Sequence, residues 1–315
     1  MLISPPFGGG RAPVLARNAV ASSQPLATQA GIEALQNGGN AVDAALATAI
    51  TLTVVEPTMN GLGGDGFAIL WDGKKLHGLN ASGRAPAAWT PEYFAGKSAM
   101  DLIGWNTVTV PGMVAGWVEL SKKFGKLTFA QLFKRAIDYA ENGFPVSPVI
   151  ARQWREAIPI LRNQPGFSES FLIDGKAPQA GQIWRYPAQA KTLKEIAATQ
   201  GESFYRGPLA QSMVDFAQST GGCFTMQDFA NNKPDWVEPL AFDYGDYTLL
   251  EIPPNGSGIA AQMALGILQA ANVKQYPANS AQRIHLQIEA MRLAFADAYA
   301  YISDARSMSV PVATL

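Results

Sequence analysis

The chain has 315 residues, of which 48% are hydrophobic and 16% charged, and its formal net charge at pH 7 is −1. A nearly neutral chain lacks the basic surface that attracts nucleic acids and anionic membranes, so we expect neither as a partner. The single cysteine, Cys223, excludes an internal disulfide, and His77 and His285 are too few for a histidine-rich metal site. We therefore expect no metal and no cofactor.

The N-terminal part predicts two consecutive helices. Residues 1–20 look like an irregular lead-in without the basic and apolar regions of a secretory signal, so we expect a cytoplasmic protein. Ser23 is the expected N-cap of the first helix, which Gly38-Gly39 ends. Asn40 then caps a helix over residues 41–53 that is apolar almost all round. Such a helix lies in a core, because it is too short to cross a bilayer, which takes ~20 apolar residues.

A glycine-rich stretch, Asn60 to Phe67, follows these helices and holds four glycines in six residues. Its letters match G-x-G-x-x-G, but a phosphate loop runs from a strand into a helix, and here a helix precedes the loop. The stretch is therefore a structural connector or a backbone wall of an active site. Two apolar runs after it, residues 66–71 and 75–79, predict a β-hairpin around Asp72-Gly73.

The rest of the chain predicts a helix-rich α+β protein. Helices are expected over residues 111–124, 129–142, 187–198, 209–218, 259–271 and 281–302, and a second pair of strands over residues 240–244 and 247–252. The last helix should begin at Ser280 and carry Ile284, Ile288, Met291, Phe295, Ala298 and Ile302 on one face. These strands are too few for a complete sheet, which indicates that polypeptide outside this chain completes it.

Candidate functional residues are sparse. Arg84 lies in an apolar setting rich in glycine and proline, where an arginine would suit bidentate capture of a carboxylate; a surface or helix-capping role is the alternative. The acidic residues Asp43, Glu56, Asp65 and Asp101 lack metal-ligand spacing and are expected to be caps or surface groups. No nucleophile, base and orienting group occur together, so any reactive group lies outside this chain.

Several motifs, in a fixed order over nearly the whole chain, resemble the γ-glutamyltransferase family. They are Ser23-Gln24-Pro25-Leu26-Ala27, Gly38-Gly39-Asn40-Ala41-Val42-Asp43-Ala44-Ala45, Glu56-Pro57, Gly63-Gly64-Asp65-Gly66-Phe67, Val110-Pro111-Gly112, Pro253-Pro254 with Ser257-Gly258, and Glu289-Ala290 with Arg292, Ala294-Phe295-Ala296-Asp297.

This resemblance implies an N-terminal-nucleophile hydrolase with an αββα sandwich shared by two subunits. Residues 1–315 would be the large subunit, a single domain completed by a small subunit from the same precursor. No catalytic residue would lie in this chain, since the family's threonine nucleophile is expected after Leu315. The subunits could further associate as a dimer of heterodimers.

The chain departs from the family's pattern at its substrate contact. Glutamyl-specific members place an arginine where alignment on Ala85-Pro86 puts Ser82 in this chain. Arg84 follows two residues later, and on an extended backbone it would return to the same face. We predict that Ser82 and Arg84 bind the substrate, either as a shifted carboxylate site or for an amide other than a γ-glutamyl one.

The predicted function is therefore hydrolysis of a small carboxylate-bearing amide through a threonine acyl-enzyme, with oxamate, which gives oxalate and ammonia, as the favoured substrate. Three alternatives remain: a γ-glutamyl hydrolase or transpeptidase, a cephalosporin-acylase-like enzyme, and an inactive homologue that serves as a scaffold.

Overall fold

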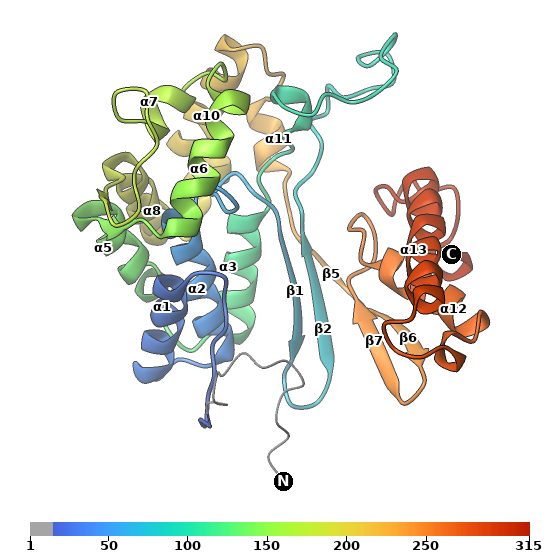
Figure 1. Ribbon diagram of the computed structural model, residues 1–315. Coiled ribbons are helices and arrows are strands. Elements are labelled where there is room, and N and C mark those ends of the chain that lie inside the picture. The colour runs from blue at the N-terminus through green and yellow to red at the C-terminus, as the bar shows by residue number, and fades with distance from the viewer. Residues whose placement is uncertain (1–14) are drawn as a thin grey trace. The chain divides into compact units, whose positions relative to one another are not determined.

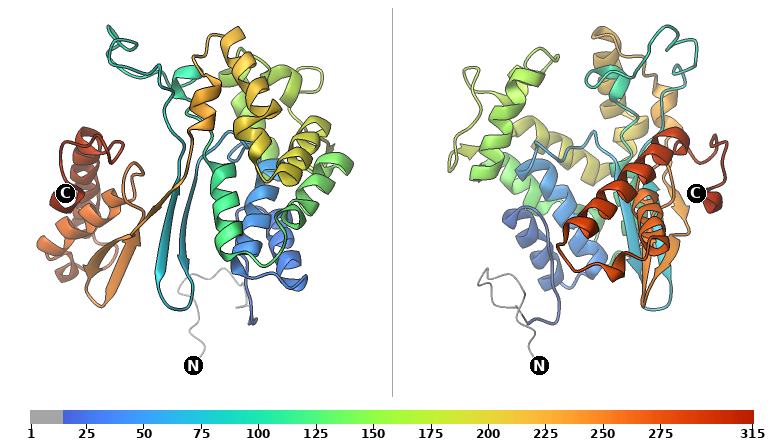
Figure 2. Two further views of the ribbon diagram at one scale, coloured as in Figure 1. Left: turned by 180° about the vertical axis from the view of Figure 1, so that it is seen from behind. Right: turned by 45° about the vertical axis from the view of Figure 1, so that its right-hand side comes forward.

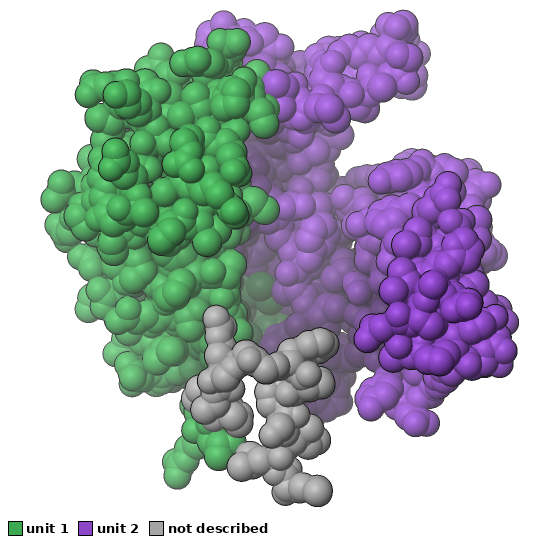
Figure 3. Space-filling view, in the orientation of Figure 1, with its two compact units in different colours: residues 1–61, 120–200 green, residues 62–119, 201–315 purple. Residues whose placement is uncertain are grey.

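The computed structural model describes residues 15–315, so most of the predicted lead-in lies outside the described residues. The chain divides into two compact units, coloured separately in Figure 3: unit 1 comprises residues up to 61 and residues 120–200, and unit 2 comprises residues 62–119 and 201–315. The division falls inside helix α3 (Met113–Phe124). Within the described residues no helix is long and apolar enough to cross a membrane.

Unit 1 is mainly helical. It contains α1 (Pro25–Gln36), α2 (Ala41–Val55), α4 (Phe129–Leu132), α5 (Lys134–Asn142), α6 (Pro148–Leu161), α7 (Phe167–Phe171), α8 (Pro187–Thr199) and the short strands β3 (Phe144–Pro145) and β4 (Ile183–Trp184). Helices α1 and α2 pack closely because Gly31 has no side chain: a Cβ there would lie 2.3 Å from Thr48 Oγ1. Helix α2 is buried almost all round, as its composition predicts.

The caps of these two helices differ from the sequence prediction in one respect. Gln24, not Ser23, caps α1, and its side chain accepts a hydrogen bond from Leu26 N. The Ser23 hydroxyl instead donates to Glu56, which is buried. The predicted cap of α2 is confirmed: Asn40 forms a capping box with Asp43, whose carboxylate is fully buried and also accepts from Lys126 N.

Unit 2 contains a three-stranded antiparallel sheet in the order β1-β2-β5 (Figures 1 and 2). Strands β1 (Gly66–Trp71) and β2 (Leu76–Ala81) form the predicted hairpin, and Asp72 Oδ1 accepts from the backbone N–H groups of Lys74 and Lys75 in its turn. Strand β5 (Asp235–Val237) pairs with β2 and was not expected from the sequence.

The remaining elements of unit 2 follow. They are η1 (Trp105–Thr107), α9 (Glu202–Arg206), α10 (Pro208–Ser219), α11 (Met226–Ala230), β6 (Leu240–Tyr244), β7 (Tyr247–Glu251), α12 (Ile259–Ala270), η2 (Val273–Gln275), α13 (Ala281–Tyr301) and η3 (Val312–Thr314). Strands β6 and β7 form the second predicted hairpin. The buried Gln262 of α12 donates to the carbonyl oxygens of Leu240 and Leu249, which fastens the helix to both strands.

Two helix predictions need correction. The expected single helix over residues 129–142 is two helices. The N–H of the buried Phe133 bonds to Ala130 O, three residues back and not four, and this turn ends α4. On α13 the buried face is formed by Ala290, Ala294 and Ala298, which allow close packing against α12. Half of the predicted apolar stripe is exposed instead: Ile284, Ile288 and Met291 are 45%, 54% and 41% exposed.

Candidate functional site

The two predicted substrate-binding residues lie just beyond the end of β2. Strand β2 ends at Ala81, and Gly83 has φ +85°, so the backbone between Ser82 and Arg84 is not extended as the sequence argument assumed. Ser82 and Arg84 nevertheless line the same cavity, because the chain turns at Gly83, which lies between them. The cavity measures about 390 Å³, a volume suited to a small molecule.

Backbone packing fixes the position of Gly83. A Cβ at Gly83 would lie 1.8 Å from Val110 O, and a Cβ at Gly112 would lie 2.1 Å from Ala81 O. Val110 N donates to Arg84 O at 2.9 Å, so the two segments are also joined by a hydrogen bond. Glycine at 83 and 112 is therefore required by the close approach of these two stretches of backbone.

A buried tyrosine holds the second of these stretches. The Tyr205 hydroxyl donates to Pro111 O at 2.7 Å and accepts from Ala115 N at 2.9 Å. Burial raises the pKa of Tyr205, so its hydroxyl stays neutral and keeps both bonds.

The predicted Ser82 is hydrogen-bonded to two asparagines. Its backbone N–H donates to Asn80 Oδ1 at 3.0 Å. Asn80 Nδ2 donates to Asn255 Oδ1 at 2.8 Å, and the Asn255 amide exchanges hydrogen bonds with the Ser82 hydroxyl at 3.1 and 3.2 Å. Asn255 belongs to the loop between β7 and α12 and was not identified from the sequence.

Arg84 is paired with a carboxylate of its own unit. Its Nη2 lies 3.2 Å from both oxygens of Asp235, which is the β5 partner of Asn80 in the sheet register. The Arg84 side chain is 27% exposed, and neither Nε nor Nη1 is hydrogen-bonded to another residue within the described range 15–315. The guanidinium is thus oriented by Asp235 while further N–H groups remain available to a ligand.

A second arginine–aspartate pair lines the cavity after α13. Arg306 Nε donates to Asp304 Oδ1 at 2.8 Å, and this interaction is the main cause that lowers the pKa of Asp304 to about 2. With Lys233, the cavity wall carries three cationic and two anionic side chains. The other lining residues are Asn80, Ser82, Gly83, Ala85, Thr109, Val237, Pro254, Asn255 and Ala305. A wall with this excess of positive charge favours an anionic ligand.

The glycine-rich stretch has a structural role at the start of α3. Gly64 O accepts hydrogen bonds from Gly112 N and Met113 N, both at 3.2 Å. Two of the N–H groups that a phosphate would need at this helix terminus are therefore already bound. Residues 60–67 do not line the cavity at Arg84, so the structure favours a connector over a wall of that site.

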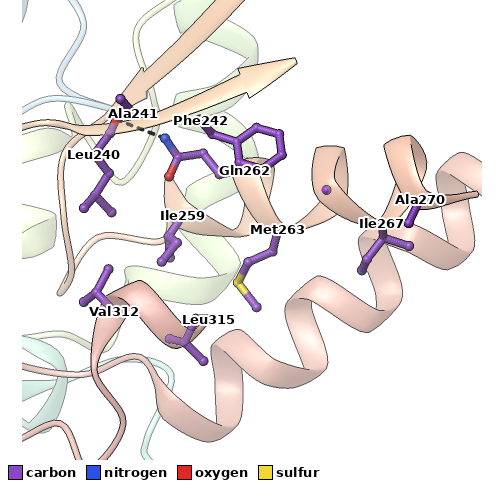
Figure 4. Close-up of a pocket in the computed structure, with 11 residues that line it drawn as sticks. Leu240, Ala241, Phe242, Ile259, Gln262, Met263, Ile267, Ala270, Val312 and Leu315 are labelled. Atoms are coloured by element: carbon purple, nitrogen blue, oxygen red, sulfur yellow. Dashed lines mark hydrogen bonds between the residues drawn. The ribbon is translucent and has the colours of Figure 1, made fainter. Parts of the chain in front are cut away.

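A larger cavity of about 780 Å³ lies between β6 and α12, near the C-terminus (Figure 4). Its lining residues are Leu240, Ala241, Phe242, Ile259, Gln262, Met263, Gly266, Ile267, Ala270, Val312 and Leu315. Gln262 is the polar side chain among them, and it already donates to two carbonyl oxygens. This cavity lacks the charged groups that would orient a small polar substrate, so we place the candidate site at Arg84.

The two histidines and the cysteine noted in the sequence do not line the candidate cavity. In the part of the chain that the structure describes, no three His, Cys, Asp or Glu side chains lie close enough to hold a metal ion. His77 pairs with Asp72 at 2.7 Å, His285 is exposed on α13, and Cys223 is a half-buried free thiol.

Comparison with known proteins decides the family. The family model described as gamma-glutamyltranspeptidase matches residues 27–315. The chain belongs to the γ-glutamyltranspeptidase family. The family resemblance of the motifs is thereby confirmed, and with it a helix-rich α+β chain of the N-terminal-nucleophile hydrolase fold.

Three relatives illustrate the range of this family. An oxamate amidohydrolase proenzyme of Klebsiella pneumoniae is 37% identical over 298 residues, covering 92% of this chain and 56% of its own length. A γ-glutamyltranspeptidase structure from Pseudomonas nitroreducens, complexed with L-DON, is 34% identical with a TM-score of 0.87 and covers 96% of this chain and 91% of that one. A cephalosporin acylase structure from Bacillus halodurans is 43% identical with a TM-score of 0.85, covering 97% and 60%.

The chain spans little more than half the length of the curated relatives it matches. The comparisons therefore establish the family of these 315 residues, and the activity of the whole protein is a matter for proposal.

Proposed function

We propose that this chain is the large-subunit part of a self-processing amidohydrolase that cleaves a small carboxylate-bearing amide, with oxamate as the favoured substrate. The observation that carries the proposal is the Arg84 guanidinium, which is oriented by Asp235 beside Ser82 in a small cationic cavity and retains unbound N–H groups. Arginine binds a carboxylate through such groups in two parallel hydrogen bonds.

The reaction is acyl transfer to a threonine supplied by the small subunit. Its hydroxyl attacks the amide carbonyl, its own α-amine serves as base, and backbone donors stabilise the oxyanion. The C–N bond breaks, ammonia leaves with the proton that the α-amine took from the hydroxyl, and water then releases the acid from the acyl-enzyme. The role of the described chain is to bind the substrate carboxylate, while residues beyond Leu315 carry the nucleophile.

The same proposal includes the assembly. The chain and the small subunit come from one cytoplasmic precursor. They share an αββα sandwich and together form the single domain to which residues 1–315 belong. Two such heterodimers can associate into a dimer of heterodimers. The name proenzyme, given to relatives such as the oxamate amidohydrolase, supports processing of a precursor.

The second candidate is hydrolysis or transfer of γ-glutamyl groups, as in glutathione. It is supported by the similarity to the γ-glutamyltranspeptidase structure. The similarity to a cephalosporin acylase supports a third candidate function, hydrolysis of an amide with a larger acyl group. We favour oxamate because the family resemblance aligns Ser82 with the arginine that binds glutamate in other members, and because the cavity is small.

Purified, processed full-length protein should release ammonia from oxamate. Parallel assays with γ-glutamyl-p-nitroanilide separate the first two candidates, and turnover of that compound alone would overturn the choice of oxamate. An inactive scaffold would lack the threonine at the cleavage point, which sequencing of the residues after Leu315 decides.

Substitution of Arg84 tests the carboxylate site. Arg84→Ala should raise the KM for oxamate at least about tenfold or abolish turnover, with self-cleavage intact, because both charged hydrogen bonds to the carboxylate are lost. Arg84→Lys should restore only part of the activity, because an ammonium cannot bind both carboxylate oxygens in the fork geometry.

The matched control for Arg84 is Arg152→Ala, which removes an exposed arginine that pairs with Glu156 on α6. The control should leave KM unchanged. Equal kinetics for Arg84→Ala and the wild-type protein would make Arg84 a structural partner of Asp235 and nothing more.

A further inference from the structure

We propose that Asn255 is a positioning residue that fixes the Ser82 hydroxyl as a hydrogen-bond acceptor for an N–H group of the substrate. This inference rests on the proposed function and specifies the substrate class of the same site: an amide that carries both a carboxylate and an N–H group.

The direction of each hydrogen bond follows from one fixed donor. The backbone N–H of Ser82 can only donate, and it donates to Asn80, so the Asn80 atom at 3.0 Å from it is the carbonyl oxygen. Asn80 Nδ2 then donates to Asn255, which identifies the Asn255 atom 2.8 Å away as Oδ1. The Asn255 Nδ2 must therefore lie toward Ser82 Oγ, at 3.1 Å.

This arrangement determines what Ser82 can offer to a ligand. The Ser82 hydroxyl donates its proton to Asn255 Oδ1 at 3.2 Å and accepts from Asn255 Nδ2. A hydroxyl has one proton and two acceptor positions, so Ser82 Oγ retains one acceptor position and no free proton. Since Ser82 lines the cavity, it presents that acceptor to the bound molecule.

Ser82 and Arg84 then recognise opposite kinds of group. Arg84 can only donate hydrogen bonds, and it suits a carboxylate. The backbone from Ser82 to Arg84 spans at most about 7 Å, so one small molecule can contact both residues. Oxamate joins a carboxylate directly to a primary amide, which matches the pair; the corresponding ester has no N–H and would leave the Ser82 acceptor unbound.

The experiment compares an amide with its ester in the processed full-length enzyme. The substrates are oxamate and methyl oxalate. Asn255→Ala and Ser82→Ala should each lower kcat/KM for the amide about tenfold, mainly through KM. The same variants should change kcat/KM for the ester by less than about twofold. The double variant should lose no more than either single one, because both residues act through one hydrogen bond.

Two controls separate positioning from general damage. Asn231→Ala removes an exposed asparagine that is hydrogen-bonded to Gln227, and it should leave kcat/KM unchanged for both substrates. Self-cleavage and thermal stability should be the same in all variants. Equal losses for amide and ester, or an unchanged amide rate in Ser82→Ala, would overturn the proposal.

Failure of the proposed substrate is a different outcome. If the wild-type enzyme does not hydrolyse oxamate, the same comparison is made with glutamine and glutamate γ-methyl ester, and the change in the amide-to-ester ratio still decides the role of Asn255. If neither pair is hydrolysed, calorimetric binding of oxamate and methyl oxalate to the same variants replaces the rate. Loss of the preference for oxamate in Asn255→Ala supports the proposal, and an unchanged preference contradicts it.

Discussion

Gly83 separates the two side chains that form the candidate site, and its conformation permits a clean test. Gly83→Ala should destabilise the protein by more than about 3 kcal/mol, because the new Cβ meets Val110 O and φ is positive. Gly73→Ala is the matched control, since φ there is +96° but the space around it is open. Only about 1 kcal/mol is expected for this variant.

Urea unfolding of both variants measures the difference. Similar losses at the two positions would mean that backbone strain, and not the contact with Val110, explains the glycine at 83.

At the level of single residues, two side chains that line the candidate cavity, Ser82 and Arg84, were predicted from the sequence, and their role in binding stays a prediction. These two residues were identified because they precede the family motif Ala85-Pro86 and because Ser82 stands where the family resemblance predicts an arginine. Asp235 and Asn255 were missed because they lie more than 150 residues further along the chain. Their proximity depends on the pairing of β5 with β2, and an asparagine in a loop carries no local signal of its role.

Among the elements, the β1–β2 hairpin has a turn that should respond to acid. The hydrogen bond from His77 is the largest cause that lowers the pKa of Asp72, followed by the N–H groups of Lys75 and Lys74. A carboxylate with a lowered pKa in the folded state stabilises the fold above its unfolded pKa of about 4 and loses that effect as pH falls below it.

Asp72→Asn tests this behaviour by thermal unfolding. The wild-type protein should have the higher Tm from pH 5 to 7, and the difference should shrink progressively below pH 4. Asp246→Asn, in the turn of the β6–β7 hairpin, is the control because Asp246 has no side-chain hydrogen bond to another described residue. A difference for Asp72→Asn that does not change with pH would contradict the argument.

Elements with strong local signals were predicted, and those that depend on distant contacts were not. Helix α2 and both hairpins follow from capping, turn residues and apolar composition. Strand β5 has three residues and no alternating pattern, so its partner defines it. Helix α6 was missed although Ser147 caps it and Pro148 begins it, partly because Pro159 lies within it.

For the whole molecule, the exposed apolar stripe of α13 leads to a prediction about the proposed small subunit. Ile284, Ile288 and Met291 are exposed, and a partner chain that covers them would bury them. Ile288→Glu should then destabilise the processed full-length protein by more than about 2 kcal/mol, because a charge would be buried.

Val149→Glu provides the control, since Val149 on α6 is 54% exposed, as is Ile288, and is not part of the stripe. Its Tm should change little. If Ile288→Glu also leaves the Tm unchanged, the stripe remains in contact with solvent in the mature protein.

The pairing of β5 with β2 also has a consequence for the order in which the protein folds. Asn80 of β2 pairs with Asp235, so the sheet joins residues that are synthesised far apart in time. Contacts of such long separation form slowly, because a long loop must close before they contribute. A nascent chain that has not yet reached β5 has neither Asp235 nor Asn255, so Arg84 and Ser82 become oriented only late in synthesis. The candidate site therefore cannot form on a nascent chain that ends before β5, however complete its helices are.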